Sequence, residues 1–360
     1  MSKRVVIIGA GIFGCEIAIN FDRIGYDVLL LEKNESILSK ASHFNQNRVH
    51  LGFHYPRSSE TASQAIRAFD QFTSKYSNAI RDDHDSYYCI SSEASNVSFD
   101  EYLKFCDSLN LKYELVESNT LHGCLNLDKV SSQMLRTNEK VFDVEIIRQQ
   151  ILRELRYSNV TVKYNSYVER ILKGEVNYVK LASGKTHEAE IIINCTYSDI
   201  NRVLYGDSEQ MNLKYQNVLL PIVKSDSFIP SLTIMDGPFC SVLPKGLSSN
   251  DYIVSNVKYS VLQESKELCN LEPLSSFDHK QIARLIIETS ADFIPILHKT
   301  SLVDYWAVRK ALPVDAKDSR LTKVDKINGA DIFSVLQGKI STSQLVFDEI
   351  LILLNENKKK

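Results

Sequence analysis

The sequence predicts a two-lobed α/β protein in which a β-rich domain is inserted into a doubly wound α/β domain. Residues 4–31 contain an apolar run, a glycine-rich turn, a helical pattern and a second apolar run, as in a βαβ unit. Strand patterns with Pro and Gly at the turns dominate residues 211–257, after which helix and strand patterns return. A length of 360 residues suits two lobes better than one compact core.

The N-terminal elements follow from periodicity. Residues 4–9 and 26–31 are continuous apolar runs typical of strands buried on both faces, and residues 12–24 have helical apolar spacing. The same criteria predict further helices and strands: helices at 60–76, 98–109 and 142–155, and strands at 86–91, 160–164, 167–172, 177–181 and 191–194.

The C-terminal third begins with the strand-rich residues 211–257. A helix at 277–293, a strand at 332–336, a turn at Gly338 and a closing helix at 342–354 follow. We therefore predict a cofactor domain and a substrate domain: residues 1–85, 140–210 and 300–360 for the first, and 86–139 and 211–299 for the second.

Composition excludes several classes of function. Hydrophobic residues make up 44% of the chain and charged residues 24%, as in an ordinary globular protein. A net charge of -3 gives no global attraction to nucleic acid, so we expect no nucleic-acid partner. The seven cysteines form no CxxC pair, which argues against a metal site and favours a reducing compartment such as the cytoplasm.

No segment predicts membrane insertion or export. The apolar runs are too short to cross a bilayer. Lys3 and Arg4 precede a short strand pattern rather than the apolar core of a signal peptide. The three lysines at 358–360 are interpreted as a solvated end.

The turn after the first strand carries the motif GxGxxG, spelled GAGIFG by Gly9, Gly11 and Gly14. In a dinucleotide-binding unit the first glycine permits the tight turn, the second lets the backbone approach a pyrophosphate, and the third lets helix and strand pack closely. Glu32 follows the second strand, where a carboxylate can accept hydrogen bonds from ribose hydroxyls. The motif predicts NAD or FAD without choosing between them.

The polar stretch at residues 39–57 has neither a helix nor a strand period, whereas an NAD domain continues as regular βαβ units. Here the chain resembles the FAD-dependent D-amino acid oxidase superfamily, and within it the L-2-hydroxyglutarate oxidase branch. The motif N-x-x-x-[IV]-H-x-G-x-x-Y-x-x-x-S-x-x-A is matched without a gap by Asn45, Val49, His50, Gly52, Tyr55, Ser59 and Ala62.

Three later segments resemble the same superfamily: residues 142–151, 191–204 and 334–350. Tyr197 departs from the pattern, because it stands where the family usually has glycine. The resemblance implies a Rossmann-type FAD-binding domain, with FAD as cofactor. It implies cofactor contacts by Gly9, Gly11, Gly14, Glu32, Lys33, Asn45, Gln46, Val168, Thr196, Gly338, Lys339 and Ile340.

The resemblance also implies the chemistry, which is hydride removal from a carbon bearing N or O. His50 is a candidate to accept the substrate proton, because histidine titrates near working pH; the alternative is a histidine that only hydrogen-bonds the cofactor or the backbone. Arg48, which we expect to face away from His50, is a candidate to stabilise negative charge on the reduced flavin or to hold a substrate carboxylate; the alternative is a surface ion pair. Arg309, which we expect on a strand between Trp306 and Pro313, resembles the arginine that holds the substrate carboxylate in amino acid oxidases; the alternative is an arginine on the surface of that strand.

We expect His54, Tyr55 and Lys245 to line the substrate pocket. The predicted function is oxidation of an L-2-hydroxy acid or an amino acid-like amine to the keto acid or imine, with a small and carboxylate-bearing substrate. Two alternatives stay open: a flavin-dependent isomerase of nucleotide sugars, and an FAD-binding protein without catalysis. The sequence does not determine the electron acceptor or the oligomeric state.

Overall fold

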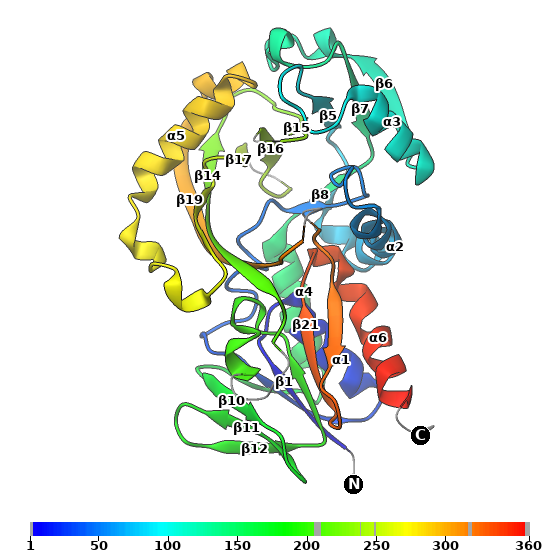
Figure 1. Ribbon diagram of the computed structural model, residues 1–360, viewed down its shortest axis with the longest axis vertical. Coiled ribbons are helices and arrows are strands. Elements are labelled where there is room, and N and C mark those ends of the chain that lie inside the picture. Colours follow the sequence, from blue (N-terminus) through cyan, green and yellow to red (C-terminus); the bar gives the residue numbers. More distant parts are fainter. Residues whose placement is uncertain (1–2, 205–209, 238, 248–249, 316–318, 357–360) are drawn as a thin grey trace.

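The computed structural model describes residues 3–204, 210–237, 239–247, 250–315 and 319–356. Figure 1 shows two lobes stacked along the long axis, one built on a six-stranded sheet and one on a nine-stranded sheet. No described helix is both long and apolar enough to cross a bilayer.

The six-stranded sheet has the order β20-β21-β13-β1-β2-β9. Its strands are parallel except for the edge strand β20. Their bounds are β1 Arg4–Ile8, β2 Asp27–Leu31, β9 Thr161–Lys163, β13 Ile191–Asn194, β20 Lys323–Lys326 and β21 Ile332–Leu336. Branched apolar residues make the central strands suitable for burial on both faces, and β1, β2 and β13 confirm the predicted βαβ start.

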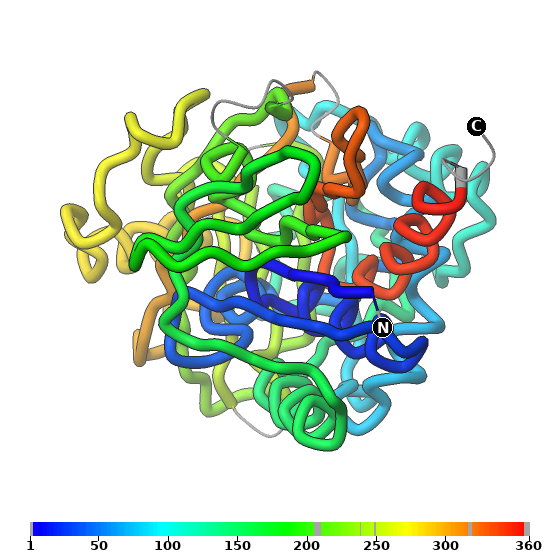
Figure 2. Tube along the Cα trace, turned by 90° about the horizontal axis from the view of Figure 1, so that it is seen from below, coloured from blue at the N-terminus to red at the C-terminus, as the bar shows by residue number. Residues whose placement is uncertain are grey.

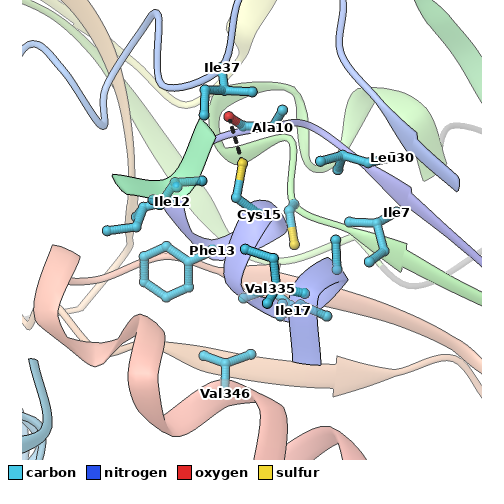
Figure 3. Packing of buried hydrophobic residues seen from close by; sticks show 14 of the residues in the cluster. Ile7, Ala10, Ile12, Phe13, Cys15, Ile17, Leu30, Ile37, Val335 and Val346 are labelled. Carbon is cyan, nitrogen blue, oxygen red and sulfur yellow. Dashed lines mark hydrogen bonds between the residues drawn. The ribbon is translucent and has the colours of Figure 1, made fainter. Parts of the chain in front are cut away.

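A layer of helices covers one face of this sheet. α1 (Ile12–Arg23) packs against α4 (Val144–Arg156) and α6 (Ser343–Glu356), and α2 (Ser59–Lys75) packs on α6. Figure 3 shows this core at α1, where apolar side chains of the sheet, of α1 and of α6 form one cluster. The packing fixes the start of α1 relative to the sheet.

A small antiparallel sheet covers the other face. It consists of β10 (Val168–Leu172), β11 (Asn177–Leu181) and β12 (Thr186–Ala189). Its apolar side chains form one cluster with side chains of β1, β2 and β13. Figure 2, from below, shows these green strands beside the blue N-terminal strand.

The nine-stranded sheet forms the second lobe, with the order β18-β14-β17-β16-β15-β5-β7-β6 and β19 paired to β14. α5 (His279–Ala291) packs on one side of it, and α3 (Phe99–Ser108) lies near its β5–β7 end. The strands are β5 Ser86–Ile90, β6 Tyr113–Glu117, β7 Gln133–Thr137, β14 Leu213–Lys224, β15 Ser231–Met235, β16 Cys240–Pro244, β17 Asp251–Asn256, β18 Val261–Ser265 and β19 Ser301–Pro313.

The predicted domain division placed residues 300–360, and with them the long strand β19, in the cofactor domain. β19 pairs with β14 along its whole length, so it belongs to the sheet of the second lobe. The strand expected around Arg309, between Trp306 and Pro313, is part of β19, which begins earlier, at Ser301. The prediction missed β6 and β7; β7 pairs with β5 on one side and with β6 on the other.

A fourth, short sheet lies between the two large ones (Figure 1). It has the order β3-β8-β4, with bounds Arg48–Val49, Lys140–Phe142 and Ile80–Arg81. β3 is the only strand within residues 39–57, a stretch without predicted periodicity. Because β8 pairs with both neighbours, it fixes the backbone of Arg48 where the lobes meet.

Candidate active site

The glycine motif forms the turn between β1 and α1. Gly9 has a φ of +97°, a conformation that favours glycine, and a Cβ there would lie 2.7 Å from the carbonyl oxygen of Cys195. A Cβ at Gly14 would lie 1.9 Å from the Gly9 carbonyl oxygen, and one at Gly11 would lie 3.1 Å from Ser42 Oγ. At each of the three positions a side chain would come too close to neighbouring atoms, which explains why glycine stands there.

Glu32 follows β2 directly and is buried. Its Oε2 accepts a hydrogen bond from the Ala10 amide at 2.7 Å. Its Oε1 accepts from the backbone and side-chain amides of Asn34 at 2.9 and 2.6 Å. A carboxylate accepts about four hydrogen bonds, so Glu32 retains acceptor capacity for ribose hydroxyls in the cavity that it lines.

A cavity of about 330 Å³ passes the glycine turn, and we call it the Gly-turn cavity. Lys33, which lines it, forms an ion pair with Asp199 at 2.6 Å. The N-terminal end of α1 supplies backbone N–H groups and positive dipole charge for a pyrophosphate. The predicted cofactor residues in its lining are Gly9, Gly11, Glu32, Lys33, Val168 and Thr196.

A second cavity, of about 150 Å³, adjoins the first, since four residues line both: Ala41, Ser42, Tyr197 and Gln337. No described lining residue is acidic, and four are basic: Arg48, Lys310, Arg320 and Lys339. We call it the cationic cavity. Its lining also includes five residues from the predicted site: Asn45, Gln46, His50, Gly338 and Ile340.

Gly338 and Tyr197 shape the junction of the two cavities. A Cβ at Gly338 would lie 2.0 Å from the Arg320 carbonyl oxygen, so the turn before α6 requires glycine. Tyr197 has a φ of +55°. The residue that departs from the family pattern therefore keeps a backbone conformation that glycine adopts most easily.

Arg48 lies on β3, lines the cationic cavity and is hydrogen-bonded to two strands of the second lobe. Its guanidinium donates to the Tyr88 hydroxyl and, at 2.7 Å, to Thr233 Oγ1. The Glu139 carboxylate lies 3.6 Å from Arg48 Nη1. Arg48 is therefore buried beside the Glu139 carboxylate and does not form an ion pair at the surface.

The expectation that Arg48 and His50 face opposite ways is wrong. Both line the cationic cavity, and Glu139 approaches both. The physical reason is that residues two positions apart in an extended segment point to the same side.

His50 is buried beside aromatic rings. Its Nε2 lies 3.4 Å from the Tyr55 hydroxyl, and its ring centroid lies 5.4 Å from that of His54. Burial lowers the pKa of His50 well below its usual value, and the charges of Lys339 and Arg48 lower it further. His50 is therefore neutral near pH 7 and can accept a proton.

The two lysines of the cationic cavity are also shifted. Burial, followed by the charge of Arg48, lowers the pKa of Lys339 to about 7. Burial, followed by the charge of Arg320, lowers the pKa of Lys310 to about 8. An anion in this cavity would favour the charged form of both amines.

Four residues of the predicted catalytic site and substrate pocket lie outside the cationic cavity lining, among them Tyr55, which contacts His50. Arg309 lines the Gly-turn cavity instead, and its guanidinium donates to Asn217 Oδ1 and to the Glu272 carbonyl, both at 3.1 Å. Lys245 lies 5.5 Å from the Trp306 ring centroid and outside both linings. His54 contacts Arg48 at 3.4 Å but is not among the lining residues.

Sequence reasoning missed Lys310, Arg320 and Glu139. Lys310 follows Arg309 in WAVRKALP, and neighbouring residues of a strand face opposite sides. The alternation along β19 was thus an available signal for Lys310. Arg320 and Glu139 lie in short connections, where the sequence carries no periodic signal.

Comparisons with known proteins agree with this geometry. The model of the family described as FAD dependent oxidoreductase (DAO) matches residues 4–317. A curated relative, the FAD-dependent monooxygenase FPY4 of Fusarium mangiferae, is 24% identical over 97% of this chain and 90% of its own length. The FAD-dependent monooxygenase kojA of Aspergillus flavus is 25% identical over 79% of this chain and 69% of its own length.

Solved structures share the fold. Glycine oxidase from Geobacillus kaustophilus superposes with a TM-score of 0.79 at 12% identity, covering 99% of this chain and 95% of its own. L-proline dehydrogenase from P. horikoshii superposes with a TM-score of 0.77 at 13% identity, covering 99% and 94%. The glycine turn, the two adjoining cavities and the family match together show that the chain belongs to the DAO family of FAD-dependent oxidoreductases.

Proposed function

We propose that this FAD-dependent oxidoreductase oxidises a small substrate that carries a carboxylate, either an L-2-hydroxy acid or an amino acid-like amine. The cationic cavity carries this proposal, because four basic side chains and no described acidic one line a space that adjoins the Gly-turn cavity. A cavity lined by several basic side chains favours an anion. The seven cysteines, all free, agree with a reducing cytoplasm.

The residues fit FAD. The glycine turn and the start of α1 would hold the pyrophosphate, Glu32 the adenosine ribose, and the junction near Gly338 the flavin end. When bound, the flavin accepts a hydride from the substrate carbon. The chain contributes binding, orientation and proton transfer.

Each group of the cationic cavity has a place in this reaction. Lys310 and Lys339 would bind the carboxylate, and the bound anion would raise the pKa of both amines. Neutral His50 would take the hydroxyl or amine proton at Nε2. Arg48 adds fixed positive charge at the cavity wall.

The test is anaerobic mixing of the flavin-loaded protein with matched pairs of L-2-hydroxy acids, L-amino acids and their methyl esters. We expect an acid to bleach the flavin absorbance and the ester, which lacks the carboxylate, to react at least about tenfold less efficiently, as lost charge-assisted bonds imply. Equal reaction of acid and ester would overturn the assignment of the carboxylate.

A second function is favoured by the curated relatives, which are named FAD-dependent monooxygenases. A monooxygenase transfers one atom of dioxygen to its product, whereas an oxidase or dehydrogenase does not. Turnover under ¹⁸O₂ separates the two, since only a monooxygenase incorporates the label from dioxygen.

A further inference from the structure

Glu139 is a fully enclosed carboxylate outside the cavity lining, with 2% of its surface exposed. It lies in the connection between β7 and β8, directly before the first residue of β8. Its Oε1 accepts the Leu51 backbone N–H at 2.8 Å, and its Oε2 accepts the Tyr88 hydroxyl proton at 2.5 Å. Both oxygens are therefore fixed by donors from two elements.

The two functional side chains of the site approach this carboxylate. Arg48 Nη1 lies 3.6 Å from Oε2, and His50 Nδ1 lies 3.9 Å from Oε1. His50 Nδ1 is buried and has no hydrogen-bond partner in the described part of the chain. Leu51, whose amide Glu139 holds, follows His50 directly, so the carboxylate also fixes the local backbone.

We propose that Glu139 is a positioning residue: its carboxylate receives the Nδ1–H of His50, so that Nε2 is left as the proton acceptor, and it holds Arg48 at the cavity wall. A shortening of the 3.9 Å separation by about 1 Å makes this hydrogen bond. The second ring nitrogen, Nε2, then faces the Tyr55 hydroxyl at 3.4 Å.

The positive charges around His50 explain why a nearby carboxylate matters for its protonation. Lys339, Arg48 and His54 lower its pKa, after burial, and all disfavour a proton on His50. Tyr55 and Tyr88 are the titratable hydroxyls near the pair, and burial raises the pKa of Tyr88. Glu139 is the one described carboxylate within 4 Å of His50, so it offsets the repulsion when His50 takes the substrate proton.

The experiment reads the tautomer of His50 by ¹⁵N NMR in FAD-loaded protein labelled at histidine, with the signals assigned by His50→Asn. We expect the wild type to show the Nδ1–H tautomer. Glu139→Ala should lose this preference. A wild-type Nε2–H tautomer overturns the proposal, as does an unchanged tautomer in the variant. The wild-type result decides even where Glu139→Ala does not fold.

A second readout uses Glu139→Gln, which keeps the shape and removes the charge. We expect flavin reduction to slow by about tenfold to a hundredfold with a smaller change in KM, as for other groups that orient a reacting residue. The matched control is Glu16→Gln, another buried carboxylate, which bonds Tyr76 and Gln344 outside both cavities. Equal slowing in both variants would show a merely structural role.

The proposal rests on the proposed function for the reaction that His50 serves, but the two fail separately. The tautomer measurement needs no substrate. Absence of flavin reduction by any carboxylate substrate would overturn the function, while a wrong tautomer would overturn the role of Glu139 alone.

Discussion

At the residue scale, the site places a neutral histidine, His50, beside the basic side chains of the cationic cavity. His50, Lys310 and Lys339 all have pKa values below their usual ones, with burial as the main cause. Burial disfavours their charged forms, and an anionic ligand reverses that effect. Substrate charge and protonation of the site are thus coupled.

Lys339 gives a pH prediction in cofactor-free protein. Its pKa is about 7 in the folded chain and about 10.4 in an unfolded one. Burial of the charged Lys339 amine therefore lowers the free energy of unfolding by its full amount below pH 7, and this cost disappears as pH rises toward 10. We expect Lys339→Met to raise the melting temperature at pH 7, with a smaller gain at pH 9.5. The exposed Lys299→Met is the control, and a gain independent of pH would contradict the prediction.

Gly11 gives a cofactor prediction. A branched side chain there would meet Ser42 and fill the space that the pyrophosphate needs. We expect Gly11→Val to fold but to retain no flavin, measured as absorbance per folded protein. Thr186→Val, at an exposed position of β12 outside both cavity linings, should keep its flavin. Full flavin content in Gly11→Val would sink the assignment.

Glu32 gives a graded effect. We expect Glu32→Ala to weaken FAD affinity by about tenfold to a hundredfold, because charge-assisted hydrogen bonds to the ribose are lost. Titration of apoprotein with FAD measures it. The exposed neighbour Glu35→Ala should bind FAD as the wild type does.

At the element scale, helix starts place the site. Asp143 caps α4: its Oδ1 accepts the amide protons of Glu145 and Ile146 at 3.0 and 3.2 Å, and its Oδ2 accepts that of Leu247 at 3.3 Å. The same side chain therefore ends the short sheet, starts a helix of the first lobe and holds a turn of the second.

Asp143→Ala should lower the free energy of unfolding by about 1 to 2 kcal/mol, as for other lost caps. Asp143→Asn should cost less, because asparagine caps helices about equally well. Urea denaturation compares them. Equal stability of the alanine variant and the wild type would show that the cap contributes nothing.

At the scale of the whole molecule, β19 carries neighbouring basic residues to two cavities. Arg309 lines the Gly-turn cavity and Lys310 the cationic cavity. We expect Arg309→Lys to weaken FAD retention and Lys310→Met to raise KM with flavin retained. Flavin content and steady-state kinetics measure both effects. The reverse pattern would show that Arg309, and not Lys310, binds the substrate carboxylate.

The sequence by itself determined the parts that rest on local pattern. The apolar runs of β1 and β2, the three glycines and Glu32 lie within one βαβ unit, so their spacing sufficed to predict a dinucleotide site. The family match of residues 45–62 then predicted FAD. The family model and the shared fold confirm that cofactor and the oxidoreductase class.

The tertiary structure alone decided which distant side chains meet. Glu139, Tyr88 and Thr233 reach Arg48 from three separate strands or connections, with no periodicity to announce them. Pairing of β19 with β14, whose partner residues are 77 to 100 positions apart in sequence, decided that Lys310 and not Arg309 lines the cationic cavity. Long-range pairing depends on which surfaces complement each other in the folded chain, and local sequence encodes only the alternation of faces.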